Sequence, residues 1–362
     1  KNKLQFCDKV RLKDNKIVGK LSIKSKQATG DELERLKQKN HTDILRALAF
    51  AYSPTNIPDY PYCGLFGVFS YDFIDQFEEL PKNKHDILDV PDYIFYYVDN
   101  LFVVDNRINK MHIIANAIGI DGKDEEYIHE RCLKKIQEYK NALTKEIKEE
   151  IEVTRINAVT SDTSQQEYIE VVKKMKRHIL NGDVFQIVPS RTIVAKGKFN
   201  PLQVYEQLRS INPSPYMFFI DFQDHQLVGS SPELAIRVKG KSEKKIEIRP
   251  IAGTKPRGIK NSVLDADLDS RYEVELKTDE KELAEHMMLV DLARNDIAKI
   301  SLPGTRVVDR PLIIEKYSHV QHLVSNVSGV LKKELDALHA YLATMNMGTV
   351  CGAPKIEAMK IL

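Results

Sequence analysis

Two glutamates spaced three residues apart are the clearest candidates for chemistry in this chain. Glu282 and Glu285 fall in TDEKELAEHMMLVDLARND, residues 278–296, a stretch with helical periodicity beside His286. Residues at this spacing are neighbours on a helix surface, and two carboxylates there could hold a hard cation such as Mg²⁺. The spacing leaves an alternative open, a solvated helix face on which both glutamates pair with lysines.

Two segments of small residues could bind an anion. RPIAGTKPRG, residues 249–258, runs from a strand-like stretch into Ala252, Gly253 and Thr254. Backbone N–H groups there could face a negative ligand, although Ala252 itself is chemically inert. GTVCGAP, residues 348–354, precedes a helix-like stretch, and helix N-termini attract anions. An ordinary loop-to-helix turn would also explain this second segment.

Other polar clusters have simpler interpretations. The alternating segment 316–331 predicts a strand with His319 and His322 on opposite faces. A single histidine in a strand is usually a structural residue. The polar residues at 291–296 favour a capping and salt-bridge network at a helix end rather than catalysis.

These residues require a scaffold in which helices and strands are interspersed. The predicted strands are residues 64–74, 93–106, 111–120, 183–195, 316–331 and two within 217–240. The predicted helices are residues 126–150, 164–182, which opens with a capping box at Ser164 and Glu167 and ends at Gly182, and 278–296. Several strands are joined without helical crossovers, which favours an α+β fold with mixed or antiparallel sheets.

The helix predicted at 278–296 and a polar connector at 151–164 have further predicted features. Thr278 or Asp279 could cap the helix at 278–296, and Leu283, Met287 and Val290 are its expected apolar stripe. A polar connector at 151–164 is the expected boundary between an N-terminal part, residues 1–160, and a catalytic part, residues 161–362.

The overall composition excludes several classes of protein. The chain has 362 residues, 42% hydrophobic and 29% charged, with a formal net charge of +2. A charge this small argues against nucleic-acid binding. No apolar run reaches the ~18 residues of a membrane span, and the N-terminal residues lack the apolar core of a signal peptide. Four cysteines without a CxxC motif favour reduced thiols and a cytoplasmic protein; they are Cys7, Cys63, Cys132 and Cys351.

In their order, these segments resemble the chorismate-utilising enzyme family. SSPELAIRV, PIAGTKPRG, ELKTDEKELAEHMMLVDLARNDIAKI, YSHVQHLVS and MNMGTVCGAPK follow one another as in that family. NPSPYMFF, residues 212–219, narrows the resemblance to the large subunits of anthranilate synthases. The resemblance runs from about Gly64 to Leu362 and is dense after Gly182. It implies a β-sandwich core with helices outside, and a lyase that converts chorismate and ammonia to anthranilate and pyruvate, the first step of tryptophan biosynthesis.

The resemblance also implies roles for particular residues. Glu285 matches a glutamate that ligates Mg²⁺, and Glu282 matches its neighbour at the metal site. Glu233 matches the general acid that protonates the departing C4 hydroxyl, so its pKa should be raised. His322 matches the histidine associated with loss of the enolpyruvyl group as pyruvate. The substrate-contacting positions are matched by Ala252, Gly253, Thr254, Thr349 and Gly352.

Two positions distinguish the branches of this family. Aminodeoxychorismate synthases carry a nucleophilic lysine where this chain has Ala252. Isochorismate and salicylate synthases carry a water-activating lysine where it has Gln186, and an amide cannot accept a proton at neutral pH. With neither lysine present, ammonia itself is the expected nucleophile.

Regulation and partners are implied in the same way. Pro215, Tyr216 and Met217 match residues that line an allosteric pocket for L-tryptophan. A glutamine amidotransferase subunit, component II, is the expected source of ammonia, in a heterotetramer.

Segments that the family carries before and after these motifs are missing, so both ends are expected to be truncated. A chain without them is expected to be inactive. The alternatives that stay open are another amino-transferring chorismate enzyme, an aminodeoxyisochorismate or aminodeoxychorismate synthase, and a catalytically incomplete fragment that acts only as a binding module.

Overall fold

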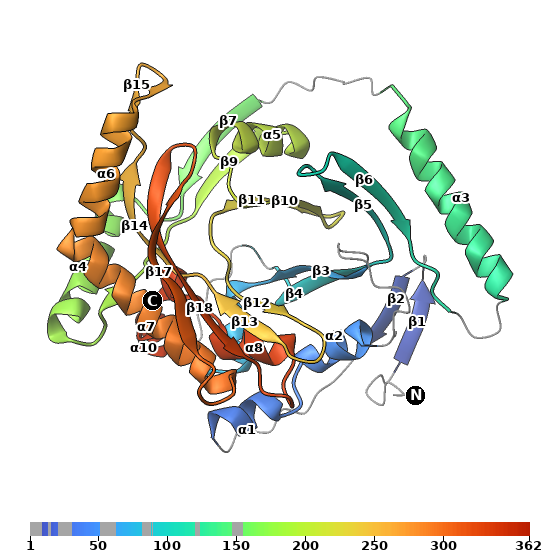
Figure 1. The fold of residues 1–362 in the computed structure, drawn as a ribbon, viewed down its shortest axis with the longest axis horizontal. Helices are drawn as coiled ribbons and strands as arrows, with labels where there is room; N and C mark the ends of the chain where they lie inside the picture. Colours follow the sequence, from blue (N-terminus) through green and yellow to red (C-terminus); the bar gives the residue numbers. More distant parts are fainter. Residues whose placement is uncertain are drawn as a thin grey trace. The chain divides into compact units, whose positions relative to one another are not determined.

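A computed structural model describes residues 9–13, 16–20, 31–50, 63–81, 88, 90–119, 124–146 and 155–362 (Figure 1). The chain divides into two compact units. The first comprises Lys1–Ala28, Gln38–Phe73 and Leu88–Glu150, and the second comprises Thr29–Lys37, Ile74–Ile87 and Ile151–Leu362. This division reflects which parts of the chain contact one another. It does not test the domain boundary expected at residue 160, which stays a prediction.

The first unit is built from antiparallel hairpins and helices. Strands β3 and β4 pair in register from Gly64↔Val98 to Phe69↔Tyr93. Phe69, Phe73, Tyr93 and Phe95 pack as an aromatic cluster, with ring centroids 4.9–6.2 Å apart. The elements of this unit are β1 Lys9–Lys13, β2 Lys16–Lys20, α2 Thr42–Ala49, β3 Gly64–Phe69, β4 Tyr93–Val98, β5 Asn100–Asp105, β6 Lys110–Ala115 and α3 Glu125–Leu143; the 3₁₀ helix η1, Tyr71–Gln76, begins here and ends in the second unit.

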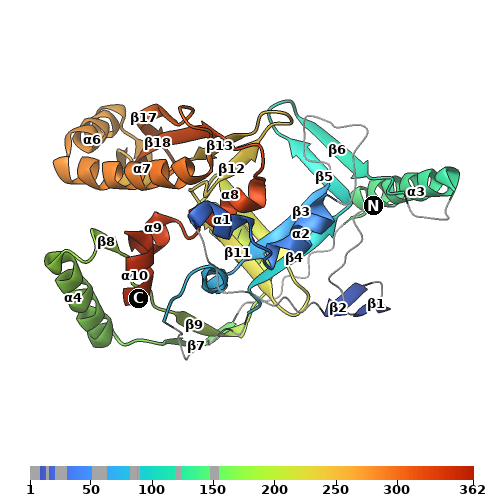
Figure 2. The same cartoon turned by 90° about the horizontal axis from the view of Figure 1, so that it is seen from below.

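The second unit is organised around a five-stranded antiparallel sheet. Strand β18 pairs with β13 and β14 on one side and with β17 on the other, and β12 extends the sheet beyond β13. Its strands are β12 Arg237–Lys239, β13 Lys245–Ile248, β14 Ile251–Pro256, β17 Val307–Lys316 and β18 Val320–Val330. Helix α7, Glu280–Ile300, packs on β14 and β18, and Figure 2 shows α6, Ala266–Thr278, beside it. Ile248, Val290, Ile297 and Val327 form the core between α7 and the sheet.

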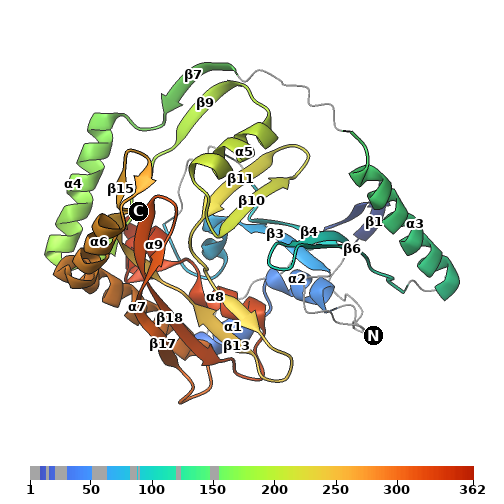
Figure 3. The same cartoon turned by 45° about the horizontal axis from the view of Figure 1, so that its top comes forward.

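Shorter elements complete the second unit. Helix α5 packs on the β10–β11 hairpin, as Figure 3 shows. The remaining elements are α1 Glu32–Lys37, β7 Arg155–Ser161, α4 Gln165–Asn181, β8 Gln186–Ile187, β9 Ile193–Lys198, α5 Pro201–Ile211, β10 Tyr216–Asp221, β11 Gln226–Ser231, β15 Ile259–Lys260, β16 Val263–Leu264, α8 Ala337–Thr344, α9 Gly348–Cys351, β19 Gly352–Ala353 and α10 Lys355–Ile361.

Local sequence signals at the helix ends are confirmed. Ser164 and Glu167 form the capping box of α4, and Gly182 ends that helix in the left-handed conformation, φ 83°. Asp279 caps α7 by accepting the backbone N–H groups of Lys281 and Glu282. The α+β class with antiparallel sheets is also confirmed, since every strand pair in the described residues is antiparallel.

Several predicted strands are wrong in extent. The strand predicted at 64–74 ends at Phe69, and the one at 93–106 is two strands interrupted at Asp99. The strand predicted at 183–195 consists of two short ones, β8 and β9, whose partners are far along the chain. The described part of the connector at 151–164 contains strand β7, whose residues are all exposed, so no burial pattern marks it; residues 151–154 and the end of the predicted helix, 147–150, lie outside the described residues.

Three of the four cysteines lie in the described residues. Cys63, Cys132 and Cys351 are free thiols, and burial raises the pKa of each; Cys7 lies outside the described residues. None of the described helices combines the length and the apolar character that a membrane crossing requires.

Candidate active site

Helix α7 places both candidate metal-binding glutamates at its N-terminal end. Its buried positions are His286, Leu289, Val290, Ala293, Asp296, Ile297 and Ile300. The predicted stripe is therefore wrong at Met287, which is 50% exposed. Glu282 and Glu285, both half-buried, lie beside this face, near the strands that carry the other candidates.

The carboxylate of Glu282 lies against the segment of small residues on β14. A β-bulge between Ala252 and Thr254 leaves Gly253 at φ 80°. A Cβ at Gly253 would lie 3.3 Å from Glu282 Oε2 and 3.0 Å from a methyl of Leu323. The left-handed conformation and this close approach both favour glycine at the bulge. The backbone of this segment and a candidate metal ligand are thus brought together.

Glu285 lines a cavity of about 670 Å³ together with Gln186. The other lining residues are largely apolar and come from α4, β8 and α7: Ile179, Phe185, Ile187, Lys281, Ala284 and Met288. The structure therefore places Gln186 and a candidate metal ligand almost one hundred residues further along the chain on the wall of one cavity.

Gly352 brings the second segment of small residues to the same place. Strand β19 pairs with β8, with Gly352 opposite Ile187 and Ala353 opposite Gln186. Gly352 has φ 137°, and a Cβ there would lie only 2.2 Å from the carbonyl oxygen of Gln186. Only glycine allows this approach. Position 352 can therefore present only its backbone to the surroundings.

Glu233 has the environment of a carboxyl group that is still partly protonated near neutral pH. It follows β11, and its Oε2 accepts a hydrogen bond from Thr349 Oγ1 at 2.7 Å. Its Oε1 is buried with no hydrogen-bond partner in the part of the chain that the structure describes. Burial raises the pKa of Glu233 to about 7, although the hydroxyl of Thr349 and the backbone N–H of Ile251 partly offset this rise. Such a group can donate a proton in the physiological range.

His322 lies on β18 directly opposite Thr254 on β14. Thr254 Oγ1 and His322 Nδ1 are 2.9 Å apart, and burial lowers the pKa of the imidazole, which favours its neutral form. The prediction that His319 and His322 lie on opposite faces of one strand is wrong, because His319 lies in the turn before β18 begins at Val320.

The residues predicted to line the tryptophan pocket lie at the start of β10, a strand outside the five-stranded sheet that carries Thr254 and His322. Tyr216 and Met217 begin β10 and are half-buried, and Pro215 is exposed just before them. Tyr216 is close enough to Tyr317, after β17, to contribute slightly to the raised pKa of that residue.

One buried ion pair close to the site was not anticipated as such. Lys355, at the start of α10, pairs with Asp296 of α7 and donates to the carbonyl oxygen of Thr344 at 2.6 Å. The predicted salt bridges at 291–296 thus exist, and Arg294 also pairs with Asp291 at 2.8 Å. The predicted capping role is wrong, because α7 does not end there but continues to Ile300. The partner of Asp296 from α10 was missed because the pair joins residues far apart in sequence; the lysine that directly follows GTVCGAP was the available signal.

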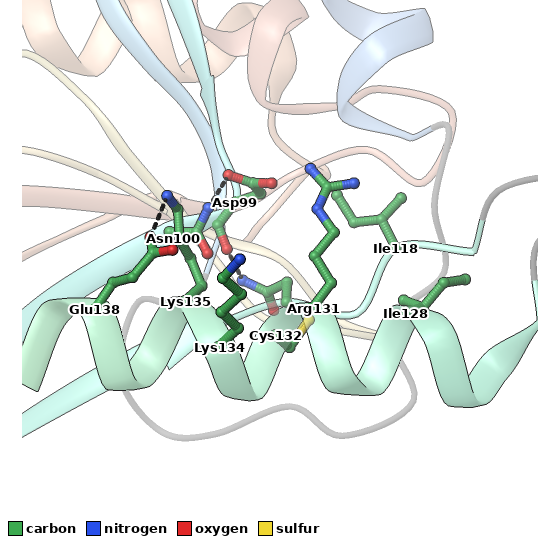
Figure 4. Close-up of a pocket in the computed structure, with 10 residues that line it drawn as sticks. Asp99, Asn100, Ile118, Ile128, Arg131, Cys132, Lys134, Lys135 and Glu138 are labelled. Atoms are coloured by element: carbon green, nitrogen blue, oxygen red, sulfur yellow. Dashed lines mark hydrogen bonds and ion pairs between the residues drawn. The ribbon is translucent and has the colours of Figure 1, made fainter.

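A second cavity, of about 280 Å³, lies in the first unit (Figure 4). It is formed by the side of α3 that carries Arg131, Lys134 and Glu138 and by Asp99 and Asn100 at the start of β5. None of the predicted site residues lines it. Most of its charged groups lie on the exposed helix α3, and none of them is a candidate for the chemistry assigned to the cluster on α7.

Comparison with known proteins identifies the family of the chain and agrees with its fold. Residues 10–362 match the family described as chorismate binding enzyme, and the chain belongs to this family. It is 43% identical over 339 residues to anthranilate synthase component 1 of Buchnera aphidicola subsp. Pemphigus spyrothecae, covering 92% of this chain and 63% of that protein. It is 39% identical over 361 residues to the protein of the same name from Vibrio cholerae serotype O1, covering 99% of this chain and 67% of that protein.

A solved structure of similar fold is anthranilate synthase component I from Streptococcus pneumoniae TIGR4. The TM-score is 0.76 at 28% identity, covering 98% of this chain and 75% of that one. The chain spans 56–63% of the length of the first curated relatives that it matches. The family resemblance drawn from the motifs is therefore confirmed.

Proposed function

We propose that this chain is the chorismate-converting part of an anthranilate synthase component 1. The reaction is addition of ammonia to chorismate, loss of the C4 hydroxyl, and elimination of pyruvate to give anthranilate, which makes the protein a lyase. The observation that carries this proposal is the buried Glu233 carboxyl, with a pKa of about 7 and a hydrogen bond to Thr349. The names of the relatives support the same reaction.

In this proposal Glu233 and His322 act in successive steps. Protonated Glu233 donates to the departing hydroxyl of chorismate, and the hydrogen bond from Thr349 orients the carboxyl group. The neutral imidazole of His322 accepts the proton that must leave the ring when pyruvate is eliminated. Ala252, Gly253, Thr254 and Gly352 shape the wall around the substrate.

The nitrogen source follows from two side chains that lack an amine. Ala252 is only 8% exposed, and Gln186 lines the cavity beside Glu285. Neither can form a covalent adduct with the ring or activate water as lysine does. Free ammonia is therefore the proposed nucleophile, supplied by a glutamine amidotransferase subunit in a heterotetramer.

Glu282 and Glu285 are the proposed ligands of Mg²⁺. No group of three or more potential metal ligands occurs among the described residues. Two carboxylates nevertheless fit Mg²⁺, which is usually held by one or two carboxylates together with water and substrate oxygens. When bound, the cation would neutralise the ring carboxylate of chorismate. The carboxylate of Glu282 is held beside Gly253, so the backbone of β14 fixes where this charge lies.

We expect Glu285→Gln to weaken Mg²⁺-dependent binding of chorismate by about tenfold or more, since one charged ligand is lost. Calorimetry with chorismate at increasing Mg²⁺ measures this. Glu280→Gln, at the first position of the same helix, is the matched control. Equal Mg²⁺ dependence in the two variants contradicts the assignment of Glu285.

Two further properties belong to the same proposal. Pro215, Tyr216 and Met217 are proposed to contact L-tryptophan as a feedback inhibitor, which requires that tryptophan favour one conformation over another. A cytoplasmic location is proposed because the free thiols and the biosynthetic role of the named relatives are consistent with it.

The test is to express the protein from its complete gene and supply chorismate, ammonium and Mg²⁺. Anthranilate fluorescence and pyruvate should rise together in equal amounts. Chorismate consumed without pyruvate would instead indicate an aminodeoxyisochorismate or aminodeoxychorismate synthase. Tryptophan binding without chorismate binding would indicate a binding module. Either result would overturn the proposal.

A further inference from the structure

The imidazole of His322 is flanked by side chains from the strands on both sides of it. Thr254 on β14 and Glu315 on β17 are both direct partners of His322 in the register of the sheet. Directly opposite residues in antiparallel strands have their side chains on the same face. Thr254, His322 and Glu315 therefore form a row across three adjacent strands.

Tyr317 is the side chain that packs directly on the imidazole. Its ring meets the ring of His322 edge-on, with centroids 5.4 Å apart and an interplanar angle of 60°. This arrangement is a favourable one for aromatic pairs. Nδ1 of the imidazole is at the same time 2.9 Å from the hydroxyl of Thr254. Contacts on two sides restrict the rotation of the ring.

Tyr317 is itself held by an ion pair that spans the sheet. Its hydroxyl donates to Glu315 Oε2 at 2.8 Å, and the other carboxylate oxygen of Glu315 pairs with Arg249. Arg249 follows β13, on the opposite side of β18 from Glu315, so its side chain reaches across β18. Burial is the largest cause that raises the pKa of Tyr317 to about 12, which keeps its hydroxyl a donor.

We propose that Tyr317, anchored by Glu315 and Arg249, is a positioning residue that fixes the imidazole of His322 for the elimination of pyruvate. This inference rests on the proposed function, in which His322 acts only after the nitrogen has been added. Loss of Tyr317 should therefore affect the second step more than the first. A misplaced base commonly costs ten- to a hundredfold in its own step.

Product partition tests this proposal. In Tyr317→Leu, the ratio of the amino intermediate that keeps its enolpyruvyl group to anthranilate should rise about tenfold, while chorismate consumption stays within about threefold. Tyr317→Phe keeps the ring and loses only the anchor, so a smaller rise is expected. Tyr272→Phe, a hydroxyl deletion on α6, is the control and should leave the ratio unchanged. An unchanged ratio in Tyr317→Leu overturns the proposal, as does an equal loss in both steps.

A second measurement separates this inference from the proposed function. Crystal structures of the unaltered protein and of Tyr317→Phe and Tyr317→Leu report the orientation of the His322 ring without any turnover. One ordered orientation should become two or more in the leucine variant. If the unaltered protein forms no anthranilate, the proposed function fails on that result alone. A single unchanged orientation in Tyr317→Leu overturns the positioning role, whatever the activity.

Discussion

Replacing Glu233 by glutamine should change the stability of the protein in a pH-dependent way. Burial raises the pKa of this carboxyl from its ordinary value of 4.5 to about 7. The unfolded chain therefore ionises first as the pH rises. Between these two values the folded state holds a proton that the unfolded state has lost, so the stabilisation present below pH 4.5 is lost progressively up to about pH 7.

The magnitude follows from the size of this rise in pKa. At about 1.36 kcal/mol per pKa unit, ionised Glu233 costs roughly 3 kcal/mol of folding stability at high pH. Glutamine cannot ionise and keeps an oxygen for the hydrogen bond from Thr349. Its amide nitrogen takes a buried position without a partner, at a cost of about 1–3 kcal/mol that does not depend on pH. The pH-dependent part is therefore separable from the constant part.

The assay is urea unfolding of both proteins at a series of pH values from 5 to 9. The difference between their free energies of unfolding is compared at each pH. The glutamine variant should gain about 2.5 kcal/mol relative to the unaltered protein across this range, because part of the total is already lost below pH 5, and most of the gain falls between about pH 5 and 8. Glu206→Gln is the matched control, because this side chain is exposed on α5 and its carboxylate stays hydrated in both states. A flat difference for Glu233→Gln would refute the argument that this carboxyl is held neutral by burial.

Two further substitutions test the contacts that shape the site. Lys355→Met leaves the Asp296 carboxylate buried without its closest cation and should cost about 3–5 kcal/mol in urea unfolding. Adding Asp296→Asn should recover part of this loss, and a cost below about 1 kcal/mol would contradict a buried pair. Gly352→Ala should cost at least about 2 kcal/mol more than Gly304→Ala. Both glycines have positive φ, but only at Gly352 would the added Cβ meet a backbone oxygen, at 2.2 Å. Equal thermal unfolding of these two alanine variants would show that β19 does not approach β8 as closely as described.

Local sequence was sufficient where the determining interaction is itself local. The capping box at Ser164 and the cap at Asp279 depend on contacts between residues two or three positions apart. The chemistry of single residues is also fixed locally: an alanine at 252 and an amide at 186 cannot act as lysine does. The motifs identified the family from the sequence alone, because each motif is defined by residue types at neighbouring positions and not by contacts in the folded chain.

The faces and breaks of regular elements needed the tertiary structure. Met287 has the spacing of a core residue, yet α7 turns His286, Leu289 and Val290 to the sheet. The rotation of a helix about its axis is set by the surface on which it packs, and the apolar pattern of α7 is too weak to fix it alone. Strand β7 shows no apolar alternation because all of its residues are exposed, and only its pairing with β9 reveals it.

The sequence by itself determined the family, the α+β class, the helix caps and the absence of an amine at residues 186 and 252. Only the tertiary structure decided which of these residues meet. Glu233 and Thr349 are 116 positions apart and share a hydrogen bond, and the pairing of β19 with β8 places Ala353 opposite Gln186. No local pattern encodes such contacts, because each joins segments that are far apart in the sequence and meet only in the folded chain. The raised pKa of Glu233 is of this kind, since burial is a property of the folded chain.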